Sequence, residues 1–141
     1  MNKFAFALFA SALTLPAAIA QDAAPASALA LELNALQPAE AGCRVTFLAT
    51  NTLGSAIDRA GVEMAFFTAD GGIDRIVTLD FTGLTDGKTK VLQFQLKDLA
   101  CDDIGRLLIN DVTACEGEGL EPGACLDGLV TTARPSIAFG V

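Results

Sequence analysis

The chain has 141 residues, a length that suits one domain, and its 17 acidic and 9 basic residues give a formal net charge of −8 at pH 7. An acidic protein without a basic patch is repelled by nucleic acid and by anionic membrane surfaces, so both are excluded as partners. The chain contains no histidine, which removes the usual general base, the usual metal ligand and every Ser-His or Cys-His pair. The composition therefore predicts a protein that is not an enzyme.

The N-terminal segment, residues 1–20, has the pattern of a cleavable signal peptide. Lys3 supplies a positive start, residues 4–15 form an apolar run, and Pro16 ends that run before the small residues Ala18-Ile19-Ala20. An apolar run of about twelve residues is too short to span a bilayer comfortably, and no paired arginines precede it, which favours the general secretion route. The alternative is a retained N-terminal anchor. We expect cleavage after Ala20 and a periplasmic or secreted protein without a membrane span.

Residues 21–27 (QDAAPAS) form an Ala/Pro-rich linker, and residues 28–141 make up the predicted domain. Within this domain, alternation of apolar and polar residues predicts short strands separated by turns. The predicted strands are 29–33, 43–50, 59–68, 73–81, 91–96, 104–112 and a last one over 129–139, and the connections between them are 37–42, 51–58, 70–72, 83–87, 98–103 and 116–123. Pro135 interrupts the last strand, which is therefore expected at a sheet edge.

The hairpin over residues 59–81 is the clearest of these elements. Asp70-Gly71-Gly72 supplies a tight turn between two alternating runs. The alternation places one set of side chains on a common buried face, namely Val62, Met64, Phe66, Ile73, Val77, Leu79 and Phe81. The rest of the chain is predicted to pack around this hairpin as an all-β fold, an antiparallel immunoglobulin-like β-sandwich of about seven strands.

The run from Val45 to Leu96 resembles bacterial immunoglobulin-like modules of the FxLYD type. Those modules have a strand that ends in asparagine, a strand with phenylalanine four residues before an aspartate, and Leu-x-x-Gly before a further strand. This chain has Asn51, then residues 66–72, then residues 84–89, but it lacks the tyrosine that is usual near the aspartate. The chain also resembles small exported cysteine-containing bacterial proteins of unknown function. The resemblance implies a fold and carries over no catalytic residue.

The four cysteines, Cys43, Cys101, Cys115 and Cys125, predict two disulfides, because an even count in an exported chain is typical of a disulfide framework. Three pairings exist. The favoured one joins Cys115 to Cys125 around the loop EGEGLEPGA and therefore joins Cys43 to Cys101. A zinc site is the competing interpretation, but the absence of histidine and of any CxxC pair disfavours it.

Carboxylates are the remaining candidates for chemistry. They fall into three groups along the sequence: Asp70 and Asp74; Asp98, Asp102 and Asp103; and Glu116, Glu118 and Glu121. Calcium takes oxygen ligands of this kind, although none of the groups has the spacing of an EF-hand loop. Solvated turn residues are the simpler interpretation, and no cofactor is expected unless calcium binds.

Leu48, Phe67 and Ile76 fall on the outward faces of their predicted strands and are the candidates for an interface. Arginines among the strand residues, such as Arg59, Arg75 and Arg106, are expected beside acidic neighbours. The favoured function is an exported, non-enzymatic interaction or accessory module for another cell-envelope protein. The alternatives are a small-ligand or calcium-binding periplasmic domain and a carboxylate-based hydrolase.

Overall fold

The computed structural model describes residues 26–141. The predicted signal peptide and most of the linker lie outside the described residues. Within residues 26–141 no helix is both long enough and apolar enough to cross a membrane.

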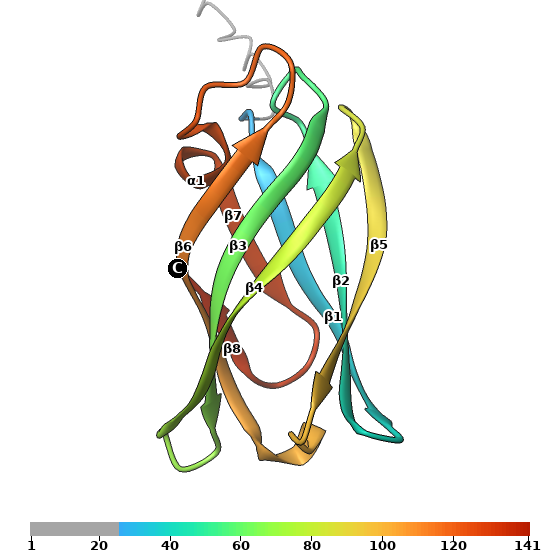
Figure 1. Cartoon of the computed structure of the whole chain (residues 1–141), viewed down its shortest axis with the longest axis vertical. Coiled ribbons are helices and arrows are strands. Elements are labelled where there is room, and N and C mark those ends of the chain that lie inside the picture. The colour runs from blue at the N-terminus through green and yellow to red at the C-terminus, as the bar shows by residue number, and fades with distance from the viewer. Residues whose placement is uncertain (1–25) are drawn as a thin grey trace, which may run out of the picture.

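The described chain is almost entirely β-structure and confirms the predicted sandwich (Figure 1). Its eight strands are β1 (Leu29–Ala39), β2 (Gly42–Asn51), β3 (Ile57–Thr68), β4 (Ile73–Leu84), β5 (Lys88–Lys97), β6 (Ile104–Glu116), β7 (Leu129–Ala133) and β8 (Ala138–Gly140). The 3-10 turn η1 (Cys101–Asp103) precedes β6, and the one-turn helix α1 (Ala124–Asp127) precedes β7. The first sheet has the strand order β5-β2-β1-β7 and the second has β4-β3-β6-β8.

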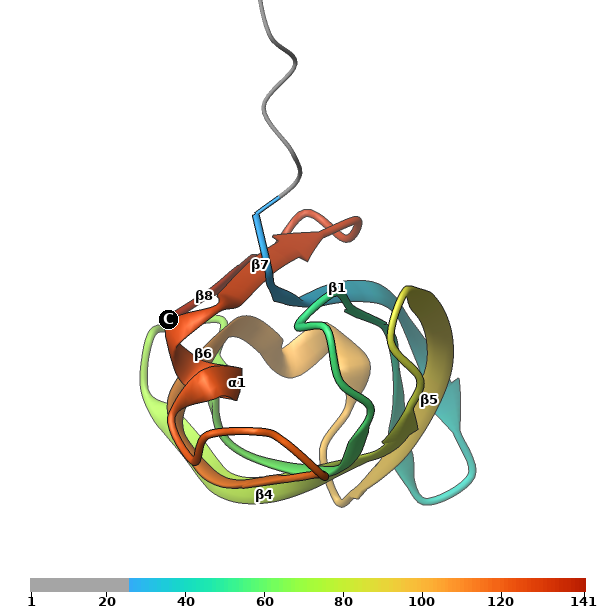
Figure 2. The ribbon, with the colours of Figure 1, turned by 90° about the horizontal axis from the view of Figure 1, so that it is seen from above.

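The two sheets curve around a common core (Figure 2), so that β4 approaches β5 on one side and β7 approaches β8 on the other. Apart from residues 134–137, which join β7 to β8, the connections gather at two opposite ends (Figure 1). We call the end with residues 40–41, 69–72 and 98–103 the turn end. We call the end with residues 52–56, 85–87 and 117–128 the loop end.

The C-terminal part of the chain differs from the prediction of one last strand, which was wrong. It forms two strands in different sheets, with β7 parallel to β1 and β8 parallel to β6. Both strands do lie at sheet edges, as the proline indicated. Because β1 and β6 belong to opposite sheets, the segment between β7 and β8 crosses from one sheet to the other.

The β3–β4 hairpin forms with the predicted turn, but its register is interrupted. Phe66 is paired with Arg75, whereas Phe67 is paired with Ile73, so Asp74 is the extra residue of a β-bulge. The bulge moves Ile73 to the outer face, where 56% of its surface is exposed. The prediction that Ile73 belongs to the buried face was therefore wrong.

Strand β1 is longer than predicted. Pro38 is still paired with Cys43, so the turn consists of Glu40 and Ala41 alone and the prediction of a turn over 37–42 was too broad. Gly42 follows this turn because a Cβ atom there would lie 2.0 Å from the carbonyl oxygen of Leu96. No other residue fits so close to a neighbouring strand.

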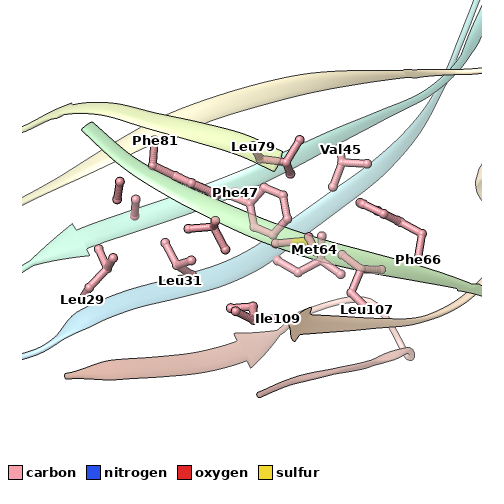
Figure 3. Packing of buried hydrophobic residues seen from close by; sticks show 14 of the residues in the cluster. Leu29, Leu31, Val45, Phe47, Met64, Phe66, Leu79, Phe81, Leu107 and Ile109 are labelled. Carbon is pink, nitrogen blue, oxygen red and sulfur yellow. The ribbon is translucent and has the colours of Figure 1, made fainter. Parts of the chain in front are cut away.

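The core lies between the sheets and is built from the inward side chains of both (Figure 3). The ring of Phe47 on β2 is fully buried, and its centroid lies 5.4 Å from that of Phe81 on β4 and 5.7 Å from that of Phe139 on β8. Phe94 on β5 completes the cluster, 5.2 Å from Phe81. Aromatic rings in these tilted and edge-to-face arrangements fix the two sheets against each other.

Both predicted disulfides are present. Cys43 on β2 is bonded to Cys101 in η1 across 58 residues of sequence, and Cys115 on β6 is bonded to Cys125 in α1 across 10. The long bridge lies at the turn end and links the first sheet to the entry of β6 in the second. The short bridge lies at the loop end and holds α1 against β6.

Candidate interaction face

The outer face of the second sheet carries a continuous group of apolar side chains near the turn end. In the strand register, Phe67 on β3 lies between Ile73 on β4 and Arg106 on β6, and Arg106 is paired with Ala138 on β8. The next row along the strands places Ala65 between Ile76 and Leu108. We call Ala65, Phe67, Ile73, Ile76, Leu108 and Ala138 the apolar patch.

The apolar patch is open to solvent at its edges and closed at its centre. Ile73 and Ile76 are 56% and 50% exposed, whereas Ala65 is only 2% exposed because larger residues flank it. The guanidinium carbon of Arg106 lies 4.6 Å from the centroid of the Phe67 ring, a cation–π contact. The patch is therefore a packed apolar surface with one arginine stacked upon it.

The same face becomes charged toward the loop end. Arg59 on β3 donates from Nη1 to Asp80 Oδ1 and from Nη2 to Glu116 Oε1, each at 2.8 Å. The guanidinium of Arg59 holds the pKa of Glu116 below its usual range, chiefly through the hydrogen bonding between these two side chains. Nearby, Asn110 donates to Glu63 at 2.6 Å. Polar and apolar side chains are thus separated into two halves of one sheet face.

Leu48, the third predicted interface residue, lies on β2 of the first sheet and faces away from Phe67 and Ile76. It is paired with Val91, and Val130 is paired with Ala30 on the same outer face. Threonines interrupt these apolar residues, for example Thr50, whose hydroxyl lies 2.7 Å from that of Thr89. The outer face of the first sheet is therefore a mixed surface without an apolar half.

Four of the predicted carboxylates come together at the turn end. Asp70, Asp74, Asp98 and Asp103 line one open hollow of about 370 Å³, which we call the acidic hollow. Asp102 instead faces a neighbouring hollow beside the Cys43–Cys101 bridge. No group of three carboxylates within residues 26–141 is close enough to hold a metal ion.

The carboxylates of the acidic hollow differ in their partners. Asp74 is paired with Arg75. Asp70 accepts hydrogen bonds from the Thr68 hydroxyl and the Gly72 N–H, which hold its pKa below the usual range. In the part of the chain that the structure describes, the side chains of Asp98 and Asp103 form neither an ion pair nor a hydrogen bond.

The third carboxylate group is dispersed. Glu116 is paired with Arg59, Glu118 lines a hollow with Asp58, and Glu121 lines another beside α1. These three side chains therefore do not share one site.

Four members of the apolar patch, Ala65, Ile73, Leu108 and Ala138, were not among the predicted interface residues. Leu108 lies between Leu107 and Ile109, both buried, so strict alternation within that apolar run already points it outward. Ile73 was assigned to the opposite face because a single-residue bulge is not visible in a hydrophobic pattern.

No family model, no curated protein and no solved structure matches this chain.

Proposed function

We propose that this protein is an exported, non-enzymatic interaction module that binds another cell-envelope protein through the apolar patch. The observation that carries the proposal is the exposure of Ile73 and Ile76 beside Phe67 on one half of a sheet face. A contiguous exposed apolar surface that includes an aromatic ring is typical of interfaces. The arginine stacked on Phe67 adds a residue type that is enriched at binding hot spots.

The sheet edges support the proposal less well than the patch does. Edge strand β5 carries Lys88, Lys90 and Lys97, and lysines on an edge discourage the addition of another strand. Two side chains also bridge the β4 and β5 edges. Lys90 donates to the carbonyl oxygen of Thr82, and Arg75 donates to that of Lys97, both at 2.6 Å. We therefore assign binding to the sheet face.

Site-specific photo-crosslinking in intact cells tests the proposal. A photoreactive residue replaces Ile76 in one variant and Val91, which is 60% exposed on the first sheet, in the matched control. We expect one discrete envelope-protein adduct from position 76 and none from position 91. The proposal fails if position 76 gives no adduct or if both positions give the same one.

A further inference from the structure

The apolar patch and the acidic hollow adjoin each other at the turn end. Thr68, which lines the hollow, directly follows Phe67, and Asp74, which also lines it, directly follows Ile73. A partner that lies along the strands of the patch therefore meets the hollow where β3 ends and β4 begins.

Asp98 and Asp103 are the carboxylates of this hollow that are exposed and without partners among the described residues. They share the hollow with Asp70 and with Asp74, and Arg75 compensates only one of these four charges. Like charges that line one hollow raise the local negative potential and attract a cation.

The spacing of these carboxylates favours a long cationic side chain over a metal ion. A calcium ion needs several oxygen atoms within about 2.6 Å, and residues 26–141 offer no such group of three acids. Lysine and arginine place their charge at the end of a flexible stem, and the guanidinium group has five donors that can serve separated acceptors.

We infer that the partner of this module presents apolar side chains to the patch and a lysine or arginine side chain to the acidic hollow. The inference rests on the proposed function and adds the chemistry of the partner. A second copy of this chain does not meet the requirement, because two copies of an acidic protein repel each other. The partner surface therefore carries a basic side chain beside an apolar area.

A displayed library of random twelve-residue peptides, selected on the purified oxidised protein, tests this inference. We expect the selected peptides to combine apolar residues with lysine or arginine. Asp98→Asn with Asp103→Asn should then weaken binding of a selected peptide about tenfold at low salt. Asp98 has φ +56°, a conformation that asparagine also tolerates, so the substitution preserves the backbone.

The matched control is Asp58→Asn with Glu118→Gln, which also removes two negative charges, but from a hollow of about 490 Å³ at the loop end. We expect less than about a twofold change in that variant, because rim charges far from the contact are screened. Calcium at millimolar concentration should leave the melting temperature unchanged.

Several outcomes overturn the inference. They are the selection of no peptide, selection without basic residues, equal weakening by the control pair, and stabilisation by calcium. Failure of the inference and failure of the proposed function are distinguishable with Ile76→Lys. If that variant loses the envelope adduct formed from a probe at position 73 while the Asp98/Asp103 variant keeps it, the function stands and the inference falls.

Discussion

The two ends of the sandwich are held by different kinds of interaction. At the turn end the connections are short, and the Cys43–Cys101 bridge, which spans 58 residues, ties the first sheet to η1. Arg75 reinforces this end by donating from β4 to the carbonyl oxygen of Lys97. At the loop end the connections are longer, and the bridge between Cys115 and Cys125 closes only 10 residues.

The side chain of Asn51 holds the connections of the loop end in place, whereas the connections of the turn end are kept short. Its side chain is fully buried, its amide donates to the carbonyl oxygens of Ser55 and Leu84, and its own side-chain oxygen accepts from Leu53 N–H. Its backbone carbonyl also accepts from Gly87 N–H at 2.7 Å. One amide therefore orders both the 52–56 and 85–87 connections, which shows that a long loop can be fixed locally by a satisfied buried polar group.

The largest expected difference between the ends concerns the disulfides. Replacing Cys43 and Cys101 by alanine should lower the free energy of unfolding by about 4 kcal/mol, whereas replacing Cys115 and Cys125 should lower it by about 2.5 kcal/mol. The reason is that the longer closed loop restricts the unfolded chain more. Urea denaturation of both double variants measures the difference, and an equal or larger loss for the short bridge would contradict it.

The next largest difference is expected between replacements of Asn51 and of Asp70, the polar residue that organises the hairpin turn at the opposite end. Asn51→Ala leaves the carbonyl oxygen of Leu84 and the N–H of Leu53 without their partner, so we expect a loss of about 2–4 kcal/mol in the free energy of unfolding. Asp70→Ala should cost less, because the exposed turn groups it leaves can bond to water. Urea denaturation checks both values, and similar losses would refute the assignment of Asn51 as the organiser of the loop end.

The smallest expected effects concern stability in acid, to which Asp70 contributes at the turn end and Glu116 at the loop end. The pKa of Asp70 is lowered by the Thr68 hydroxyl and the Gly72 N–H, and that of Glu116 by the Arg59 guanidinium. A lowered pKa in the folded state means that the stabilisation is complete above the usual carboxyl value of about 4 and is lost as pH falls through the lowered pKa. Asp70→Asn and Glu116→Gln should therefore each reduce the fall in melting temperature between about pH 5 and about pH 2.5.

Salt separates these two contributions. High salt screens the exposed Arg59–Glu116 ion pair, so it should abolish most of the difference between Glu116→Gln and the wild type. The hydrogen bonds to Asp70 are short-range, and its difference should persist. Equal sensitivity of both variants to salt would mean that long-range charge, rather than local contacts, governs acid stability at both ends.

Much of the fold could be predicted because local signals agree with the final structure. Asp70-Gly71-Gly72 between two alternating runs predicted the β3–β4 hairpin, and the loop length around Cys115 and Cys125 predicted the bridge pairing. What could not be predicted depends on long-range pairing. The separate places of β7 and β8 follow from their bonds to β1 and β6, which no pattern within residues 129–139 records.

The candidate site could likewise be predicted only where local alternation determines the direction of a side chain. Alternation along β3 and β4 placed Phe67 and Ile76 outward, and the register then brings both into one patch. Alternation also placed Leu48 outward, but only the assignment of strands to sheets reveals that it faces the opposite side. The gathering of Asp70 and Asp74 with Asp98 and Asp103 likewise required the three-dimensional arrangement of two turns far apart in sequence.

The parallel pairing of β1 with β7 has a consequence for how this chain folds. Leu29 is paired with Leu129, so the first strand gains its outer neighbour only after 100 further residues have been synthesised. Most of the residues that lie close together in this fold are distant in sequence, and such topologies fold in milliseconds to seconds rather than microseconds. Folding is therefore expected to finish only after residues 129–133 have been synthesised, and the Cys115–Cys125 bridge, which precedes β7, can close before the sheet is complete.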